Sequence, residues 1–155
     1  MRKLLLMCIL LSISLLYAKT SQLMNFEEIY SAMERGETVK VIIHYGDCQL
    51  ISDNKIQDRV PNAVGGMKLD TFEYFEKMSI GNKRAFFSSS ETKLISIRGK
   101  FTYNYAKIKV FADNEVRVIA RYLDTKNYKI TMDESFYSEI NNGENEGAAY
   151  FYLVE

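Results

Sequence analysis

The sequence predicts a mainly β domain, an antiparallel meander of seven or eight strands with one N-terminal amphipathic helix packed on it. Turn-forming residues recur at short intervals after Met67, and the segments between them are rich in β-branched and aromatic residues. The turn sites are Gly81-Asn82, Arg98-Gly99, Asp113-Asn114 and the segments 124–127 and 141–147. No spacer approaches the roughly dozen residues that a parallel crossover needs, so consecutive strands should pair antiparallel. Because closure removes exposed edges, a small barrel is the alternative to an open sheet.

The helix is predicted over residues 26–35. Asn25 is a favourable N-cap, Glu28 completes a capping-box pattern, and Gly36 is a natural C-terminal stop. The apolar residues recur at helical spacing and form one face: Phe26, Ile29, Tyr30 and Met33. Glu27, Glu34 and Arg35 should face water. We therefore expect the helix to dock on the sheet, or to plug one end of a barrel.

Strand boundaries follow from alternation and turn chemistry. Apolar and polar residues alternate over 39–45, which predicts a strand, and 67–78 form one β-rich run. Residues 49–66 resemble a long loop, and 133–140 are ambiguous between strand and helix. One hairpin allows a register prediction, because opposed residues share a face of the sheet. A three-residue loop over 113–115 would pair Val110 with Val118 and keep both on the apolar face.

The first residues have the pattern of a cleavable signal peptide, residues 1–18. Arg2 and Lys3 precede an apolar run from Leu4 to Tyr17, and small Ala18 is followed by polar residues. This run is short for a membrane span, which takes about 20 residues, but it suits a signal peptide. We expect cleavage after Ala18 and a periplasmic or secreted product. An uncleaved N-terminal anchor is the alternative.

Residues 19–155 have the length of one domain. Removal of Arg2 and Lys3 leaves 18 basic and 20 acidic side chains, a net charge of −2, which argues against nucleic acid as a partner. No second apolar run is long enough for a membrane span. Cys48 is the only cysteine after residue 18, so an intramolecular disulfide is excluded. The core must come from the 11 Tyr and 9 Phe residues, of which only Tyr17 leaves with the signal.

An aromatic strip marks a candidate ligand or partner surface. Phe101, Tyr103 and Tyr105 occupy odd positions, whereas the following apolar residues, Ala106, Ile108 and Val110, occupy even ones. Such a change of phase is typical of a bulge or of a strand that passes between two environments. Either a core strand bends here, or an aromatic strip is exposed for binding; exposed strips of this kind are the less common case.

Candidates for catalysis are weak. His44 is the only histidine and lies four residues from Cys48, but on a strand that spacing separates two side chains by about 13 Å, too far for a nucleophilic pair. Ser88 to Ser90 form a polar run without the glycine-flanked elbow that exposes a catalytic serine. The oxygen-rich loop 141–147 is explained by a solvated turn more simply than by calcium. We expect no cofactor and no metal, and a role as an enzyme is less favoured than a binding role.

Several segments resemble the VirK family of exported bacterial proteins. These are Val41 to Cys48, Asn62 to Met67, Phe87 to Thr92, Ala120 to Leu123 and Phe136 to Gly143. Their order and spacing cover the chain from about Phe26 onward. The family is named for a gene in a plant-pathogen virulence regulon, and its biochemical activity is not established. The resemblance therefore implies a bacterial, exported, virulence-associated protein and supplies no site residues.

Three functions follow as expectations. The first is a non-enzymatic binding or accessory protein of the bacterial envelope. The second is a carrier of a small apolar ligand in a barrel cavity. The third is a hydrolase that uses Cys48 or Ser88–Ser90. A cavity favours the carrier, an exposed aromatic patch favours a protein partner, and a reactive pocket joining Cys48 to His44 favours the enzyme.

Overall fold

The computed structural model describes residues 20–52 and 54–154, and the predicted signal peptide, residues 1–18, lies outside them. The described chain contains eleven strands, one α-helix and one short 3-10 helix. In chain order these are β1 (Ser21–Leu23), α2 (Phe26–Glu34), β2 (Thr38–His44), η1 (Tyr45–Asp47), β3 (Gln49–Ser52), β4 (Lys55–Ile56), β5 (Val64–Lys68), β6 (Phe72–Phe75), β7 (Phe86–Ile97), β8 (Lys100–Phe111), β9 (Glu115–Asp124), β10 (Ile130–Glu139) and β11 (Ala149–Val154). The prediction of a mainly β, antiparallel domain with one helix is confirmed.

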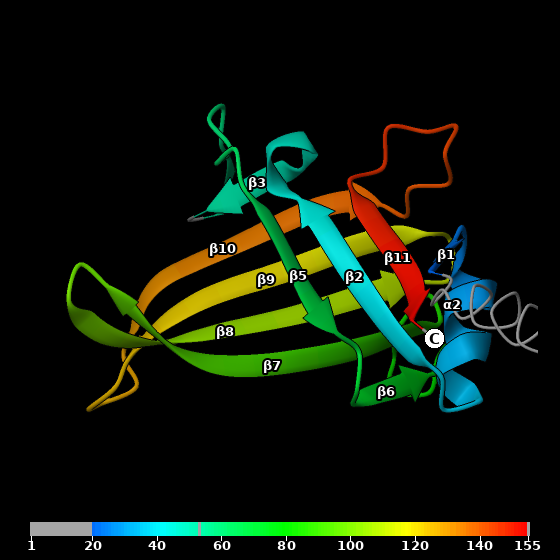
Figure 1. Cartoon of the computed structure of the whole chain (residues 1–155), viewed down its shortest axis with the longest axis horizontal. Coiled ribbons are helices and arrows are strands. Elements are labelled where there is room, and N and C mark those ends of the chain that lie inside the picture. Colours follow the sequence, from blue (N-terminus) through cyan, green and yellow to red (C-terminus); the bar gives the residue numbers. More distant parts are fainter. Residues whose placement is uncertain (1–19, 53, 155) are drawn as a thin grey trace, which may run out of the picture.

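The strands form two sheets instead of one meander (Figure 1). The larger sheet has the order β4-β3-β10-β9-β8-β7-β6, and the smaller sheet has the order β1-β11-β2-β5. Within the larger sheet, β6 to β10 follow one another as the predicted meander. In the described residues neither sheet closes on itself, so the barrel alternative is wrong. The physical reason is that β11 returns to pair with β1 and β2, which gives the domain a second layer.

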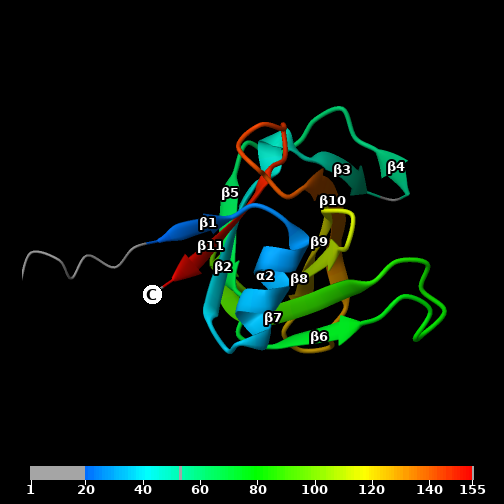
Figure 2. The same cartoon turned by 90° about the vertical axis from the view of Figure 1, so that its right-hand side faces the viewer.

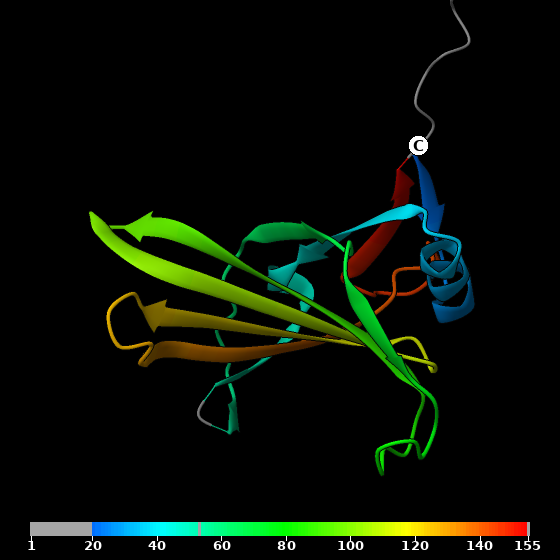
Figure 3. The ribbon, with the colours of Figure 1, turned by 90° about the horizontal axis from the view of Figure 1, so that it is seen from below.

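The core lies between the two sheets, and α2 covers one end of it (Figure 2). On β2 the side chains of Val39, Val41 and Ile43 are buried, while the residues between them face outward. Ile108 and Val110 of β8, in the larger sheet, are also buried and contribute to the core from the opposite side. The strands of the smaller sheet cross those of the larger one at a steep angle, so they cover only part of its inner face (Figures 1 and 3).

The predicted helix is present and docked. The Asn25 side chain accepts a hydrogen bond from the backbone N–H of Glu28 at 3.0 Å, and the Glu28 carboxylate accepts one from the Met24 N–H at 2.7 Å. These contacts satisfy donors that the first turn leaves free. The buried residues are Phe26, Ile29, Ala32 and Met33. Tyr30, predicted as buried, is only half-buried and stacks on Tyr74 at 4.4 Å.

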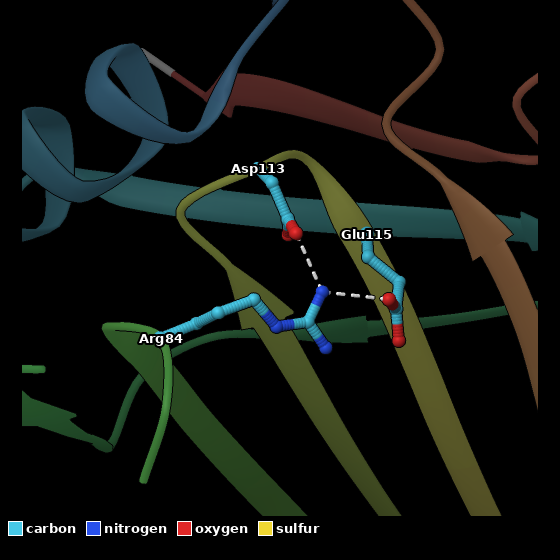
Figure 4. Close-up of polar contacts among 3 residues, drawn as sticks. All are labelled: Arg84, Asp113 and Glu115. Carbon is cyan, nitrogen blue, oxygen red and sulfur yellow. Dashed lines mark hydrogen bonds and ion pairs between the residues drawn. The ribbon is translucent and has the colours of Figure 1, made fainter. Parts of the chain in front are cut away.

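The turn between β8 and β9 ties the sheet to the start of the helix. Asn114 adopts a φ of 68°, a conformation that asparagine tolerates better than most residues. Its side-chain oxygen accepts a hydrogen bond from the Phe26 N–H at 2.8 Å. Arg84 contacts the carboxylates of Asp113 at 2.6 Å and Glu115 at 2.7 Å (Figure 4). One guanidinium group thus joins the segment before β7 to both sides of the turn.

The register of this hairpin differs from the prediction. The residues outside the strands are 112–114, and Val110 pairs with Val116 instead of Val118. Both registers keep the same residues on the inner face, so the face assignment is correct. The loop has three residues in both registers, and hydrophobic alternation alone does not distinguish them. The Arg84 bridge and the Asn114 contact stabilise the turn in the observed register.

Candidate functional site

A cleft of about 560 Å³ lies between the two sheets. One wall comes from β2, β5 and the segment before β5, and the other is the inner face of β7 to β10. The cleft exists because the smaller sheet leaves part of this inner face uncovered. The described structure thus contains a cavity between two open sheets, where the sequence predicted a cavity only inside a barrel.

The floor of the cleft is made by two small side chains. Ala106 and Ala120 lie directly opposite each other on β8 and β9. In the same row, Glu91 pairs with Ala106 and Glu134 pairs with Ala120. Larger side chains at the two alanine positions would fill the space, so the alanines create the depth of the cleft.

The end of the cleft nearer the core is apolar. The next row of the sheet contains Ile108, Val118 and Phe136, and all three side chains are at most 4% exposed. Val41 and Ile43 line the facing wall from β2. A ligand that enters this end must therefore present an apolar group.

Tyr45 brings a hydroxyl group into the cleft. Its ring packs against Phe136 with 4.6 Å between centroids, and β5 passes close to the ring at Gly65. A Cβ atom at Gly65 would lie 2.8 Å from the Tyr45 ring, so glycine is needed for this close approach. Burial raises the pKa of the Tyr45 hydroxyl, with smaller contributions from Cys48, Tyr122 and Glu91. The phenol is therefore a neutral hydrogen-bonding group at physiological pH.

The outer rim is polar. Lys93 forms an ion pair with Glu91 at 2.8 Å. Tyr122 and Asn104 are cross-strand partners in the same row, and both line the cleft. Among the described residues, the Asn104 amide and the Glu134 carboxylate form no hydrogen bond with another protein group. The rim therefore offers donors and acceptors to a ligand, whereas the inner end does not.

The structure does not bring His44 and Cys48 together as a catalytic pair. The Cys48 thiol is buried and donates to the backbone carbonyl oxygen of His44 at 3.5 Å. The His44 ring lies beside Tyr150, with 5.0 Å between centroids. Burial, with a smaller effect of Asp47, raises the pKa of the Cys48 thiol to about 11. A thiol in this state is a poor nucleophile at neutral pH.

The other candidates for catalysis or metal binding are also separated from the cleft. Ser88 and Ser89 are buried in β7, and Ser90 is exposed. In the loop 141–147, the Asn142 side-chain oxygen accepts hydrogen bonds from the backbone N–H groups of Glu144 and Asn145. Within residues 20–52 and 54–154, no three His, Cys, Asp or Glu side chains gather closely enough to hold a metal ion. None of the helices in these residues has the length and apolar character that crossing a bilayer requires.

The predicted aromatic strip lies on the outer face of the larger sheet, away from the cleft. Phe101 is 62% exposed, while Tyr103 and Tyr105 are half-buried. β8 pairs with β7 and β9 in one continuous register, so the change of phase is not a bulge. The change of phase reflects the two faces of β8, which have different surroundings. The even residues face the cleft and the core, and the odd aromatic residues face outward.

Comparison with known proteins identifies the family. The family model described as VirK protein matches residues 22–128, more than half of the chain.

The chain belongs to the VirK family.

A solved structure agrees with this assignment. lpg1832, a VirK family protein from Legionella pneumophila, matches with a TM-score of 0.63 and 11% sequence identity, over 84% of this chain and 97% of that one. At this identity the likeness shows the VirK fold alone. No curated protein sequence matches the chain.

The sequence interpretation missed the cleft residues. The signal that could have found them is the pair Ala106 and Ala120, two small residues at inward positions of long strands. Their opposition follows from the hairpin register. The facing wall comes from β2 and β5, whose position over β8 and β9 no local pattern predicts.

Proposed function

We propose that this VirK-family protein is an exported, non-enzymatic binding protein that holds a small amphiphilic molecule in the cleft between its sheets. The observation that carries the proposal is the cleft itself. Its volume of about 560 Å³ lies within the range of roughly 300–1,000 Å³ that is typical of small-molecule sites. Export is supported by the pattern of residues 1–18, and a virulence-associated role is supported by the family name.

The lining of the cleft indicates the chemistry of the ligand. Its apolar part would lie over Ala106 and Ala120, with its end against Ile108 and Phe136. Its polar part would lie at the rim, within reach of Tyr122 and the other hydrogen-bonding groups there. The rim carries both a free carboxylate and cationic side chains, so hydrogen bonding should contribute more to recognition than net charge.

A binding role also agrees with the absence of an activated nucleophile at the two candidate positions. The Cys48 thiol is protonated and buried, and Ser88 lies in the larger sheet, whereas the single histidine, His44, lies in the smaller one. The carrier function expected from sequence is retained in this proposal, with the ligand between two sheets instead of inside a barrel.

The test uses the chain from residue 19, which contains every described element. The fluorescence of N-phenyl-1-naphthylamine, an apolar probe, should rise on mixing with the protein, and uncharged dodecyl maltoside should displace the probe. The double substitution Ala106→Leu and Ala120→Leu should weaken probe binding by about tenfold or more, because two isopropyl groups then occupy the space of the ligand.

Ala112→Leu is the matched control, because Ala112 is exposed in the turn at the other end of β8. It should bind the probe like the unmodified protein. Circular dichroism and thermal melting should show that the double variant is folded. Unchanged probe affinity in a folded Ala106→Leu, Ala120→Leu protein would rule out the cleft as the binding site.

A further inference from the structure

The larger sheet ends in an exposed apolar surface. β7 to β10 extend beyond the smaller sheet, and their far ends lie opposite α2 (Figures 1 and 3). We define the tip surface as six apolar or aromatic residues on the outer face at this end: Leu94, Phe101, Tyr103, Leu123, Tyr128 and Ile130. Four of them are strongly exposed, with Leu94 at 57%, Phe101 at 62%, Tyr128 at 66% and Ile130 at 45%. Such a cluster indicates an interaction site.

The tip surface is ordered by its own contacts. The rings of Tyr103 and Tyr128 stack with 6.0 Å between centroids and an interplanar angle of 6°. Leu94 and Leu123 flank Tyr103 on the neighbouring strands. Tyr103, Tyr128 and Ile130 also line a shallow depression of about 370 Å³. The exposed aromatic side chains are therefore held in place by the sheet and by each other.

The charge around the tip surface is positive. Residues 92–105 and 121–133, which form the far part of the sheet, contain six Lys or Arg and two Asp or Glu, a net charge of +4 in a chain whose total is zero. The two acids are already paired, Asp124 with Lys100 at 3.0 Å and Asp133 with Arg121 at 2.9 Å. The remaining cations near the loops include Arg98, Lys126 and Lys129, all exposed. A partner of this end should therefore be anionic.

We propose that the tip surface docks on a lipid bilayer with anionic headgroups. Aromatic side chains favour the interface between headgroups and acyl chains, and lysine or arginine beside them binds anionic headgroups. The tip residues lie in or beside two separate connections at one end of the molecule, the β7–β8 hairpin and the β9–β10 connection. This arrangement suits shallow insertion of a tip into a surface. Docking does not depend on the cleft, so the Ala106→Leu, Ala120→Leu protein should still bind lipid.

The test uses a tryptophan reporter, because the chain contains no tryptophan. In Phe101→Trp, addition of vesicles of phosphatidylcholine and phosphatidylglycerol in equal parts should shift the emission to shorter wavelength. Phosphatidylcholine vesicles alone should give a much smaller shift. Met78→Trp is the matched control, because Met78 is 65% exposed in the loop between β6 and β7, and its emission should not change.

The contribution of charge is measured by vesicle sedimentation. Each basic side chain near an anionic surface contributes about fivefold to binding, so Lys126→Glu with Lys129→Glu should lower the partition coefficient by roughly 25-fold or more. Lys40→Glu with Lys83→Glu, both on exposed side chains elsewhere, is the control and should have a much smaller effect.

Two outcomes would overturn the proposal. One is an equal emission shift in Phe101→Trp and Met78→Trp, which would show that the tip has no preference for lipid. The other is no shift with any vesicle while the tryptophan responds to an acidic protein, for which polyglutamate is the probe. That result would assign the tip surface to a protein partner instead of a membrane.

Discussion

Replacement of Ile29 by alanine tests whether α2 is part of the cooperative core. The Ile29 side chain is fully buried, at 0% exposure, between the helix and the two sheets. Both sheets are hydrogen-bonded layers, and the helix is fixed by Asn25 and by Asn114, so the surroundings have little freedom to collapse into the space left behind. Substitutions of this kind cost about 2–5 kcal/mol, and we expect about 3 kcal/mol here. This is a large share of the roughly 5–15 kcal/mol that stabilises a typical domain.

The assay is equilibrium unfolding in urea, followed by circular dichroism. With a slope near 2 kcal/mol per molar urea, a loss of about 3 kcal/mol lowers the unfolding midpoint by about 1.5 M. Glu27→Ala is the matched control, because Glu27 lies on the exposed face of the same helix, and its free energy of unfolding should change by less than about 0.5 kcal/mol.

An unchanged midpoint in Ile29→Ala would contradict the reasoning. The helix would then be a separately melting segment, and its apolar face would be available to a partner. Deletion of residues 19–36 is an independent test of whether the helix belongs to the core. The shortened chain should be unfolded or should melt at a much lower temperature.

Further predictions concern a thiol, a glycine and the N-terminus. Cys48→Ser should leave ligand binding intact and lower the free energy of unfolding by at most a few kcal/mol. In the unmodified protein, Ellman's reagent should react with Cys48 slowly at pH 8 and faster only as the pH approaches about 11. Rapid reaction at pH 8 would contradict the assigned burial. Because the pKa of this thiol is raised from 9.0 to about 11, its contribution to stability should be complete below pH 9 and fall as the pH rises to about 11, a decline absent from Cys48→Ser. Gly147→Ala should destabilise the fold strongly, because a Cβ atom at this position would lie 2.7 to 2.9 Å from three backbone atoms. Gly46→Ala should be tolerated, because a Cβ atom there would have no neighbouring atom nearer than 3.6 Å. Equal melting temperatures for the two variants would refute this prediction. N-terminal sequencing of envelope material should give a first residue near Lys19, and a product that retains Leu4 to Tyr17 would refute cleavage after Ala18.

Local signals predicted the helix well. The cap at Asn25, the apolar spacing and the stop at Gly36 are all within one short segment, so no distant contact is needed to interpret them. The long strands β7 to β9 were also recognisable, since turn residues separate them from their immediate neighbours. The segment 133–140 is ambiguous from sequence, and all of it except Ile140 belongs to β10, where pairing with β9 and β3 decides between strand and helix.

The arrangement in two layers depends on distant pairings and could not be predicted. The segment 67–78, predicted as one strand, contains the end of β5 and all of β6, which lie in different sheets. The predicted loop 49–66 contains β3, β4 and the first residues of β5, all short strands. β4 pairs with the adjacent β3, but β3 also pairs with β10 far along the chain, and β5 pairs with β2. The cleft depends on these same pairings. For that reason nothing in the local sequence distinguishes the alanines and tyrosines that line the cleft from those elsewhere in the chain.

The position of β11 determines the order in which the domain can be completed. This strand lies between β1 and β2, so the earliest described strand pairs with the last one, for example with Ser21 opposite Leu153 (Figure 2). While the ribosome is still adding residues before 149, the smaller sheet lacks one of its two inner strands, and β1 has no strand to pair with. The growing chain therefore remains without a closed core until synthesis has passed β11. On the proposal that the protein is exported, such a delay keeps the polypeptide unfolded, as passage through a translocation pore requires.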